Sequence, residues 1–585
     1  MINFISTFPP LMCGIGTYTS YLVNKMNDKK WKVFSFKPEE FLKTEGLIPY
    51  KDKVLYEISI RNPHLNQYLK DDLVWFQHSF GMWGNDSSVL LSMVKEARHK
   101  KNKVIVSFHT IHFESKETES GMSLMEEKLL DNILPWIDLA TVFTDGAYWA
   151  IIRKFSQYKD KIVVLRHGVH SHRYMSKRHG VHSHRYMSKE DARERLLRHL
   201  IDRAEIPATT KKGLKSLSPQ LFSDNTILMG NFGFIKDPLQ LYQISKLLQD
   251  KFPSKKVITI FIGKIQKRND RKIREVYPIL ENLKAIHDGT SNIFIEDFLP
   301  EEIFPSAFSA LDFSIFWCQN ATQSGRMAHA QGTGTCVVGR RIEGMGETLD
   351  LSGLPAGVNI NDLAEKIAGL ILDPKVKEDA EKASRYYAQQ FSFENQAKKH
   401  LLLEEVVRSG KEIPSLDRSK PDFTFILPDI AIGRWNGLEE PPKEIDFFLN
   451  VADDIKLYPP PKNYYKIPFK DGVTPQVKKL REAIKFIDRC SKKGKILVFC
   501  RYGKGRSASA VIAYLCNIGY DYDEAVKLVA RKRAGINPLP GLYRIISTAL
   551  KKKSPYREKH VDTYPLMHSS WNAHNGTQAL RASHQ

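Results

Sequence analysis

The chain has 585 residues, 42% of them hydrophobic and 26% charged, and it carries a formal net charge of +22. This length exceeds a single domain of ordinary size, and the composition excludes a fibrous or largely disordered protein. No run of 18 apolar residues occurs, so we expect no membrane-spanning helix. The positive charge favours an anionic partner such as a phosphorylated substrate or a membrane surface. No nucleic-acid motif accompanies it, so we expect no nucleic-acid partner.

The six cysteines contain no C-x-x-C pair, which indicates a reducing compartment and argues against a zinc site. Residues 1–7 are typical of a strand and lack the basic start and longer apolar core of a signal peptide. We therefore expect a cytoplasmic protein without a bound metal, with peripheral association at a membrane as the alternative location.

From the N-terminus to about residue 410, short apolar runs alternate with amphipathic stretches. Clear apolar runs lie at 103–108, 161–165, 226–229 and 256–262. This alternation predicts βα units and an α/β fold with parallel sheets. Two such sheets would form two Rossmann-like halves, 1–170 and 171–408, with the ligand between them at the carboxyl ends of the strands.

The segment Thr7–Tyr18 follows the first apolar run and precedes a helix-like stretch. It resembles the opening loop of GT-B glycosyltransferases, particularly the retaining family 4 type. Further segments resemble that family in the same order: 74–78, 107–110, 167–169, 230–236, 324–326 and 343–347. The resemblance covers about 400 residues. It implies transfer of a sugar from a nucleotide-sugar donor, a substrate that needs no cofactor or metal in this fold.

The resemblance also implies a set of residues around the nucleotide sugar. They are Gly14, Gly16, His109, Gly233, Lys236, Gly325, Arg326, Glu343 and Glu347. Glycine amides, the helix start near Gly325 and the Lys236 ammonium could stabilise the departing diphosphate. His109 could lie near the sugar, and Glu343 or Glu347 could contact the ribose or the sugar. Equally, the glycines could serve only tight turns and Lys236 could be a solvated charge.

One departure from family 4 bears on activity. That family usually carries two glutamates eight positions apart near the donor, and the matching positions here are Ala321 and His329. Neither side chain is a carboxylate. The transferase region could therefore use an altered mechanism or an unusual donor, or it could be a catalytically degenerate binding module.

Residues 166–177 are repeated without change at 178–189, and each copy contains three histidines. A single perfect copy of this length indicates a recent duplication or a fault in the assembled sequence, and not a repeat architecture. A His-rich tract could bind metal, but the family resemblance already explains one copy, and we expect no metal here.

A stretch of Gly, Pro, Ser and charged residues at 409–420 predicts a linker. Residues 421–553 form the next predicted unit. The basic, polar segment 554–585 predicts a disordered tail.

Within 421–553, an apolar run ends at Cys500, and Arg506 follows after five intervening residues. A loop between a strand and a helix N-terminus presents inward N–H groups and positive potential to a phosphate. The candidate phosphate-binding loop residues are Arg501, Tyr502, Gly503, Lys504 and Gly505. We expect Cys500 to attack as a thiolate, Arg506 to bind two phosphate oxygens and Ser507 to donate to the sulfur. A lone C-x5-R pattern could also be a structural cysteine before a turn.

Further motifs support the first interpretation. Asp471 lies 29 residues before Cys500, after an apolar stretch, and could protonate the leaving oxygen. From 421 to 549 the chain resembles the dual-specificity branch of the tyrosine phosphatase superfamily, with matches at 448–452 and at Arg533–Pro538. Phe499 stands where that family usually has histidine. Cations in the loop could favour highly anionic substrates such as phosphoinositides, or could point to solvent.

These motifs together predict a bifunctional enzyme. The transferase would join a sugar to a phosphorylated acceptor, and the phosphatase would remove the phosphate. One alternative is a protein or phosphoinositide phosphatase with a degenerate glycosyltransferase-like binding module. A further one is a membrane-associated transferase with a lipid-linked acceptor. The phosphorylated substrate could thus be a small molecule, a lipid or a protein.

Overall fold

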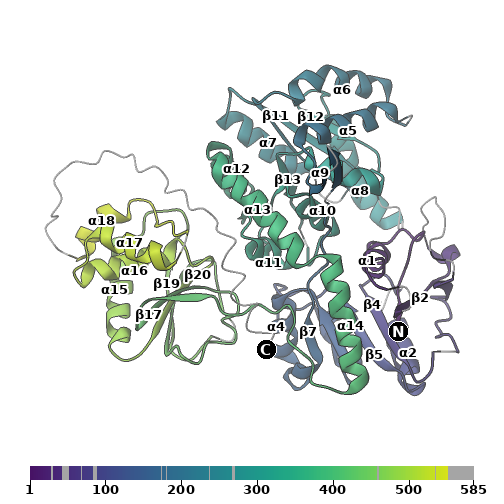
Figure 1. Ribbon diagram of the computed structural model, residues 1–585, viewed down its shortest axis with the longest axis horizontal. Helices are drawn as coiled ribbons and strands as arrows, with labels where there is room; N and C mark the ends of the chain where they lie inside the picture. Colours follow the sequence, from purple (N-terminus) through teal and green to yellow (C-terminus); the bar gives the residue numbers. More distant parts are fainter. Residues whose placement is uncertain are drawn as a thin grey trace. The chain divides into compact units, whose positions relative to one another are not determined.

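The computed structural model describes most of the chain up to residue 550. The residues outside the description are 28–29, 42–49, 51, 68, 84–87, 173, 179–180, 204, 236–237, 266–269, 320, 458–459, 534 and 551–585. The predicted tail 554–585 and the candidate Lys236 therefore lie outside the described residues. The chain divides into two compact units, Met1–Arg418 and a second that begins at Ser419 (Figure 1).

The first unit begins with a seven-stranded parallel sheet in the order β3-β2-β1-β4-β5-β6-β7. Its strands are β1 (Ile2–Ile5), β2 (Trp31–Phe36), β3 (Val54–Ile58), β4 (Leu73–His78), β5 (Lys103–Phe108), β6 (Leu139–Val142) and β7 (Ile162–Val164). Its helices are α1 (Gly14–Val23), α2 (Ser88–His99), α3 (Leu124–Ile133) and α4 (Asp145–Lys154). This strand order is that of a doubly wound, Rossmann-like sheet.

A second parallel sheet of the same type follows, in the order β12-β11-β10-β13-β14-β15. Its strands are β10 (Thr226–Phe232), β11 (Lys256–Ile262), β12 (Asn292–Ile295), β13 (Phe313–Phe316), β14 (Cys336–Arg340) and β15 (Ala356–Gly357). Its helices are α5 (Lys189–Asp202), α6 (Ala208–Leu221), α7 (Leu239–Lys251), α8 (Asp270–Ile286), α9 (Phe304–Ser309), α10 (Gly325–Thr333), α11 (Glu343–Ser352), α12 (Ile360–Leu372) and α13 (Pro374–Gln390). Both Rossmann-like halves expected from the sequence are present.

The last helix of the unit, α14 (Phe393–Ser409), returns to the first sheet. Phe393 and Leu403 share a hydrophobic cluster with Ile2 of β1, and the His400 ring stacks on Trp75 at 4.6 Å between centroids. The boundaries predicted from the sequence place this helix in the second half, 171–408. Its apolar side instead covers the first sheet, which local sequence patterns do not reveal.

The two copies of the repeated segment take different structures. The first copy continues from β7, and Val169 donates its amide hydrogen to Phe391 O (2.8 Å). Strands β8 (Tyr174–Arg178) and β9 (Val181–Arg185) then pair antiparallel as a two-stranded sheet, with Tyr174 opposite Arg185. The end of the second copy starts α5, where Ser188 accepts the Asp191 amide hydrogen.

The second unit contains a five-stranded sheet in the order β16-β17-β20-β18-β19, in which only the β16–β17 pair is antiparallel. Its strands are β16 (Phe423–Leu427), β17 (Ile430–Arg434), β18 (Phe447–Ala452), β19 (Tyr464–Phe469) and β20 (Ile496–Cys500). Its helices are α15 (Val477–Ser491), α16 (Arg506–Asn517), α17 (Tyr522–Lys532) and α18 (Leu542–Leu550). The predicted α/β class is confirmed in both units. In the described part of the chain no helix is long and apolar enough to cross a membrane.

A buried ion network joins the two halves of the first unit. The Arg166 side chain is 2% exposed, and its guanidinium lies 2.6 Å from Asp145 Oδ2 and 2.5 Å from Glu347 Oε1. Its amide hydrogen and Nε–H are donated to Asp417 Oδ2 and O. Burial alone would lower the pKa of Arg166, but the two carboxylates raise it above its usual value, so the side chain remains charged.

We predict that Arg166→Ala lowers the free energy of unfolding by about 3–5 kcal/mol, because it leaves two buried carboxylates without their cation. Urea unfolding followed by tryptophan fluorescence would measure the loss. Arg198→Ala is a matched control: it removes an exposed pair with Glu194 on α5 and should cost less than about 1 kcal/mol. Equal losses in the two variants would contradict this role for Arg166.

Candidate functional site

The candidate phosphatase site lies at the carboxyl end of β20, inside the second sheet. Cys500 is the last residue of this strand, and Arg506 is the first residue of α16. The connecting loop requires glycine at Gly503, where φ is +65° and a Cβ atom would lie 2.7 Å from the Gly433 carbonyl oxygen on β17. The C-x5-R pattern thus forms the strand–loop–helix expected of a phosphate cradle.

Neighbouring groups hold three carbonyls of this segment. The bonds run from Trp435 N to Cys500 O (3.1 Å), from Arg533 Nε to Gly503 O (2.8 Å) and from Asn537 N to Lys504 O (3.0 Å). In a trans peptide the carbonyl and the next amide point in opposite directions. The amides that follow these carbonyls therefore face away from the bracing groups, as anion binding by the loop requires.

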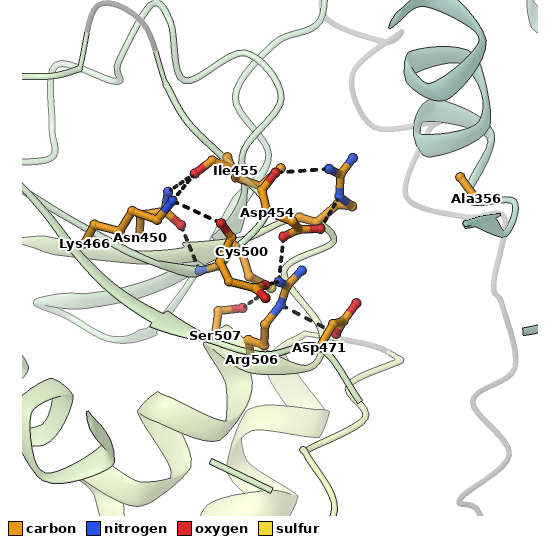
Figure 2. Close-up of polar contacts among 12 residues, drawn as sticks. Ala356, Asn450, Asp454, Ile455, Lys466, Asp471, Cys500, Arg506 and Ser507 are labelled. Atoms are coloured by element: carbon orange, nitrogen blue, oxygen red, sulfur yellow. Dashed lines mark hydrogen bonds and ion pairs between the residues drawn. The ribbon is translucent and has the colours of Figure 1, made fainter. Parts of the chain in front are cut away.

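The reactive side chains lie together at the start of α16 (Figure 2). Sγ of Cys500 is 3.2 Å from Oγ of Ser507, and both residues are buried. Nε of Arg506 is buried and has no hydrogen-bond partner within the described part of the chain. Burial would lower the pKa of Arg506, but Asp471, Cys500 and Asp454 raise it overall. The Arg506 guanidinium therefore remains charged, and Cys500 is close enough to affect its pKa.

Two carboxylates that the sequence analysis missed contact this arginine. Nη1 of Arg506 lies 2.7 Å from Asp453 Oδ1 and 2.6 Å from Asp454 Oδ1. Both aspartates directly follow β18, which pairs parallel with β20. Parallel neighbours end at the same sheet edge. Two aspartates directly after an apolar run were thus the sequence signal for these partners of Arg506. That signal could be interpreted only once the order of the strands in the sheet was known.

The predicted general acid is close to the same group. Asp471 follows β19, and its Oδ1 lies 3.5 Å from Arg506 Nε. Its side chain is 45% exposed, so it can reach both solvent and a bound phosphate ester. Arg501, by contrast, is buried, and its Nε lies 3.0 Å from Asp454 Oδ2. The sequence left two alternatives for Arg501, a side chain in solvent and a side chain free to enter the phosphate-binding loop. The ion pair with Asp454 matches neither of them.

Arg533 braces the loop where the usual histidine is absent. Phe499 occupies that position, is fully buried and cannot donate a hydrogen bond. Arg533 donates to Gly503 O and also contacts Asp422 and Thr424 Oγ1 (3.0 Å). Since Asp422 and Thr424 lie at the start of β16, this side chain ties the loop to the edge of the sheet.

In the first unit, Gly233 and Arg326 meet at the carboxyl end of β10. The Gly233 φ is +120°, and a Cβ there would lie 2.6 Å from Arg326 Cδ. Gly325 is the first residue of α10, and a Cβ atom on it would make no contact within 4 Å in the described part of the chain. Two neighbouring cavities share Trp317 in their lining. Arg326 lines one of them, and the other has a volume of about 400 Å³. Ligands of doubly wound sheets bind at this edge.

The candidates in the first half lie at the end of the first sheet. Gly16 lets α1 approach β1, since a Cβ would lie 3.0 Å from Thr7 backbone atoms, whereas Gly14 faces open space. His109 follows β5, and its Nε2 lies 2.6 Å from Gln77 Oε1. Burial lowers the pKa of His109 well below its usual value, so its ring is neutral at pH 7.

Both candidate glutamates of α11 bind the first half of the unit. Glu343 lies 2.8 Å from His112 Nδ1 and accepts the amide hydrogen of Phe113 at 3.2 Å. Glu347 accepts the amide hydrogens of Asp145 (2.8 Å) and Gly146 (2.9 Å) besides pairing with Arg166. These carboxylates therefore already have partners that join the two halves.

The strand–Cys500–loop–Arg506–helix arrangement is the one that the resemblance to cysteine-dependent phosphatases implies. Residues 439–551 match the family described as "Dual specificity phosphatase, catalytic domain". The chain is 31% identical over 144 residues to protein phosphatase Slingshot homolog 3 of Mus musculus, covering 23% of this chain and 22% of that protein. It is 33% identical over 132 residues to Slingshot homolog 1 of Homo sapiens, covering 21% and 13%. The chain thus spans less than a quarter of the length of these relatives.

Solved structures resemble the first unit at low identity. An alpha,alpha-trehalose-phosphate synthase (UDP-forming) from Burkholderia vietnamiensis has a TM-score of 0.49 and 11% identity, covering 70% of this chain and 99% of that one. Anabaena HepE in complex with UDP and glucose has a TM-score of 0.43 and 14% identity, covering 69% and 99%. The fold of the unit therefore rests on its own two strand orders, which are those of the two predicted Rossmann-like halves.

The His112–Glu343 contact should make stability depend on pH. The hydrogen bond to Glu343 raises the pKa of His112 above its usual 6.5, against the opposing effect of burial. The contact therefore stabilises fully below about pH 6.5, and the contribution is lost as pH rises through the raised folded-state pKa. We predict that Glu343→Gln loses more stability at pH 6 than at pH 9 in urea unfolding. Glu119→Gln, at an exposed site, should show no such difference, and a pH-independent loss in Glu343→Gln would refute the prediction.

Proposed function

We propose that this protein is a bifunctional enzyme that transfers a glycosyl group from a nucleotide sugar and hydrolyses a phosphate monoester through a phosphocysteine intermediate. The observation that carries the second activity is the cluster of Cys500, Ser507 and Arg506 at the start of α16, with Asp471 3.5 Å from the arginine. A nucleophile, a proton donor to its sulfur, a phosphate-binding cation and an acid are thus all within one small site.

In the first step, the Cys500 sulfur attacks phosphorus as the ester oxygen leaves. Arg506 binds two of the equatorial oxygens, where charge accumulates, and the loop amides bind the remainder. Asp471 gives its proton to the leaving oxygen, so the alcohol departs neutral. A substrate phosphate must take over Arg506 from the carboxylates of Asp453 and Asp454, so these carboxylates compete with the substrate for the guanidinium.

In the second step, water attacks the phosphocysteine. Asp471, now a carboxylate, takes the proton from water as the S–P bond breaks. Ser507 stabilises the departing sulfur through the contact at 3.2 Å. The products are the alcohol and inorganic phosphate, and the thiolate and the protonated acid are restored.

For the transferase, two doubly wound halves and a cavity of about 400 Å³ lined by Trp317 and Arg340 at the carboxyl edge of the second sheet support the proposal. Arg326, with the amides near Gly233 and Gly325, would bind the diphosphate, and Lys236 and the α1 glycines would complete this anion site. A phosphorylated acceptor would link the activities, because hydrolysis of its phosphate is irreversible and draws the transfer forward. A lipid acceptor would place the enzyme peripherally at an anionic membrane.

A second candidate function is that of a protein or phosphoinositide phosphatase whose first unit only binds a ligand. Two observations favour it. Ala321 and His329 stand where family 4 carries its glutamate pair, and Glu343 and Glu347 are engaged in joining the halves. None of these four positions then provides a carboxylate that is available to bind the nucleotide-sugar donor.

For the phosphatase, we predict that Cys500→Ser abolishes phosphate release and that Asp471→Asn slows it by about 10²–10⁴-fold on alkyl phosphates. The loss should be much smaller on p-nitrophenyl phosphate, whose leaving group needs no proton. Asp488→Asn, which removes an exposed pair on α15, is the control and should be near wild type. Equal losses of Asp471→Asn on both substrates would count against its role as the acid.

For the fused activities, we predict that Cys500→Ser supplied with nucleotide sugar and acceptor phosphate accumulates a phosphorylated glycoside, whereas wild type yields glycoside and free phosphate. Arg326→Gln should block formation of both products while leaving hydrolysis of p-nitrophenyl phosphate unchanged. Mass spectrometry of the products over a panel of donors would measure this. Calorimetry that detects no sugar nucleotide binding to wild type would instead favour the second candidate.

A further inference from the structure

Three histidines from distant parts of the chain meet in the first unit. His170 and His172 lie in the first copy of the repeated segment, and His329 lies in α10. His172 Nε2 is 3.2 Å from His329 Nδ1, and one ring nitrogen from each histidine lies within 4.8 Å of the other two. The His170 ring stacks on His329 with centroids 3.7 Å apart.

The backbone fixes this meeting. The His172 amide hydrogen is donated to Gly332 O in α10 at 3.2 Å. A Cβ on Gly332 would lie 2.2 Å from the His170 carbonyl oxygen, so only glycine lets the segment approach the helix this closely. The three rings are therefore brought together by packing and not by flexible surface side chains.

A second layer of contacts orients His329. The Tyr21 hydroxyl lies 3.4 Å from His329 Nε2 and also bonds the Glu301 carboxylate. An ionised carboxylate only accepts, so Tyr21 donates to Glu301 and can accept the Nε2–H of His329. That tautomer leaves the lone pair on Nδ1, the atom that faces His172. Metal-binding histidines are typically oriented in this way by an outer partner on the other ring nitrogen.

We propose that His170, His172 and His329 bind one divalent transition-metal ion of the Zn²⁺ class. Two nitrogens about 2.0–2.1 Å from a tetrahedral ion lie roughly 3.3 Å apart, and the observed separation is 3.2 Å. Imidazole ligands favour zinc, nickel, cobalt or copper over magnesium and calcium. A three-histidine site leaves a fourth position for water or a substrate oxygen.

The ring of His170 must turn to complete the set, because it now lies nearly parallel to His329, at 15°. The site revises the expectation of no metal, which rested on cysteine spacing and on a family resemblance. Neither the cysteine spacing nor the family resemblance predicts a contact between histidines that are 157 positions apart in the sequence.

The test uses the untagged full-length chain, stripped of metal and titrated with Zn²⁺ in a calorimeter, with native mass spectrometry for stoichiometry. We expect one ion per chain with a Kd below about 10 μM and a rise in the unfolding temperature on adding Zn²⁺. His329→Ala and His172→Ala should each weaken binding by more than 100-fold, and Tyr21→Phe by about 10-fold or more. Co²⁺ in place of Zn²⁺ should give the intense visible absorption of a tetrahedral ion in wild type and not in His329→Ala or His172→Ala.

The repeat supplies a matched control, because His182 and His184 of the second copy have the same sequence context as His170 and His172. The double variant His182→Ala/His184→Ala should bind one Zn²⁺ as tightly as wild type. If it loses the ion, or if His329→Ala keeps it, the His-rich tract alone binds metal and the proposal fails. Wild type that binds no Zn²⁺ also overturns it. If His329→Ala does not fold, His172→Ala decides, because His172 is only partly buried.

Discussion

Burial of the Arg166 guanidinium is the constraint on which the first unit depends. A charge removed from water is tolerated only with close ionic partners, and here they come from three separate segments: Asp145 at the start of α4, Glu347 in α11 and Asp417 near the end of the unit. Because Glu347 also accepts two amide hydrogens at the start of α4, the second half is fixed in orientation as well as distance. The carboxyl edges of the two sheets, where ligands of this fold class bind, are thereby held together.

The fold followed from the sequence where burial alone decides structure. The runs at 103–108 and 256–262 match β5 and β11 at both ends, because strands covered on both faces are continuously apolar. The return of α14 to the first sheet was not predictable in the same way. Its pattern specifies a helix with one apolar side, but not which of two sheets that side covers.

The residues of the candidate site also fall into those that the sequence could place and those that only the fold brings together. Cys500, Arg506 and Ser507 lie within eight residues, so the loop pattern alone placed them together. Asp453 and Asp454 reach Arg506 only because β18 lies next to β20 in the sheet. Arg533 and the histidines around His329 likewise depend on contacts between distant segments. Glu343 and Glu347 were identified by resemblance, but partners in the opposite half determine what their carboxylates do.

The hairpin formed by β8 and β9 bears on how the duplicated segment could arise. Its outermost cross-strand pair, Tyr174 opposite Arg185, lies about 5 Å apart compared with 3.8 Å for bonded neighbours, and removal of the twelve residues 174–185 would join the two positions that flank this pair, 173 and 186. A chain with a single copy would therefore need little movement to close the gap. Its one Tyr-Met-Ser-Lys sequence could then take the positions of Tyr186, Met187 and Ser188 before α5. We therefore expect that a single genetic step can insert or remove these twelve residues with little effect on stability.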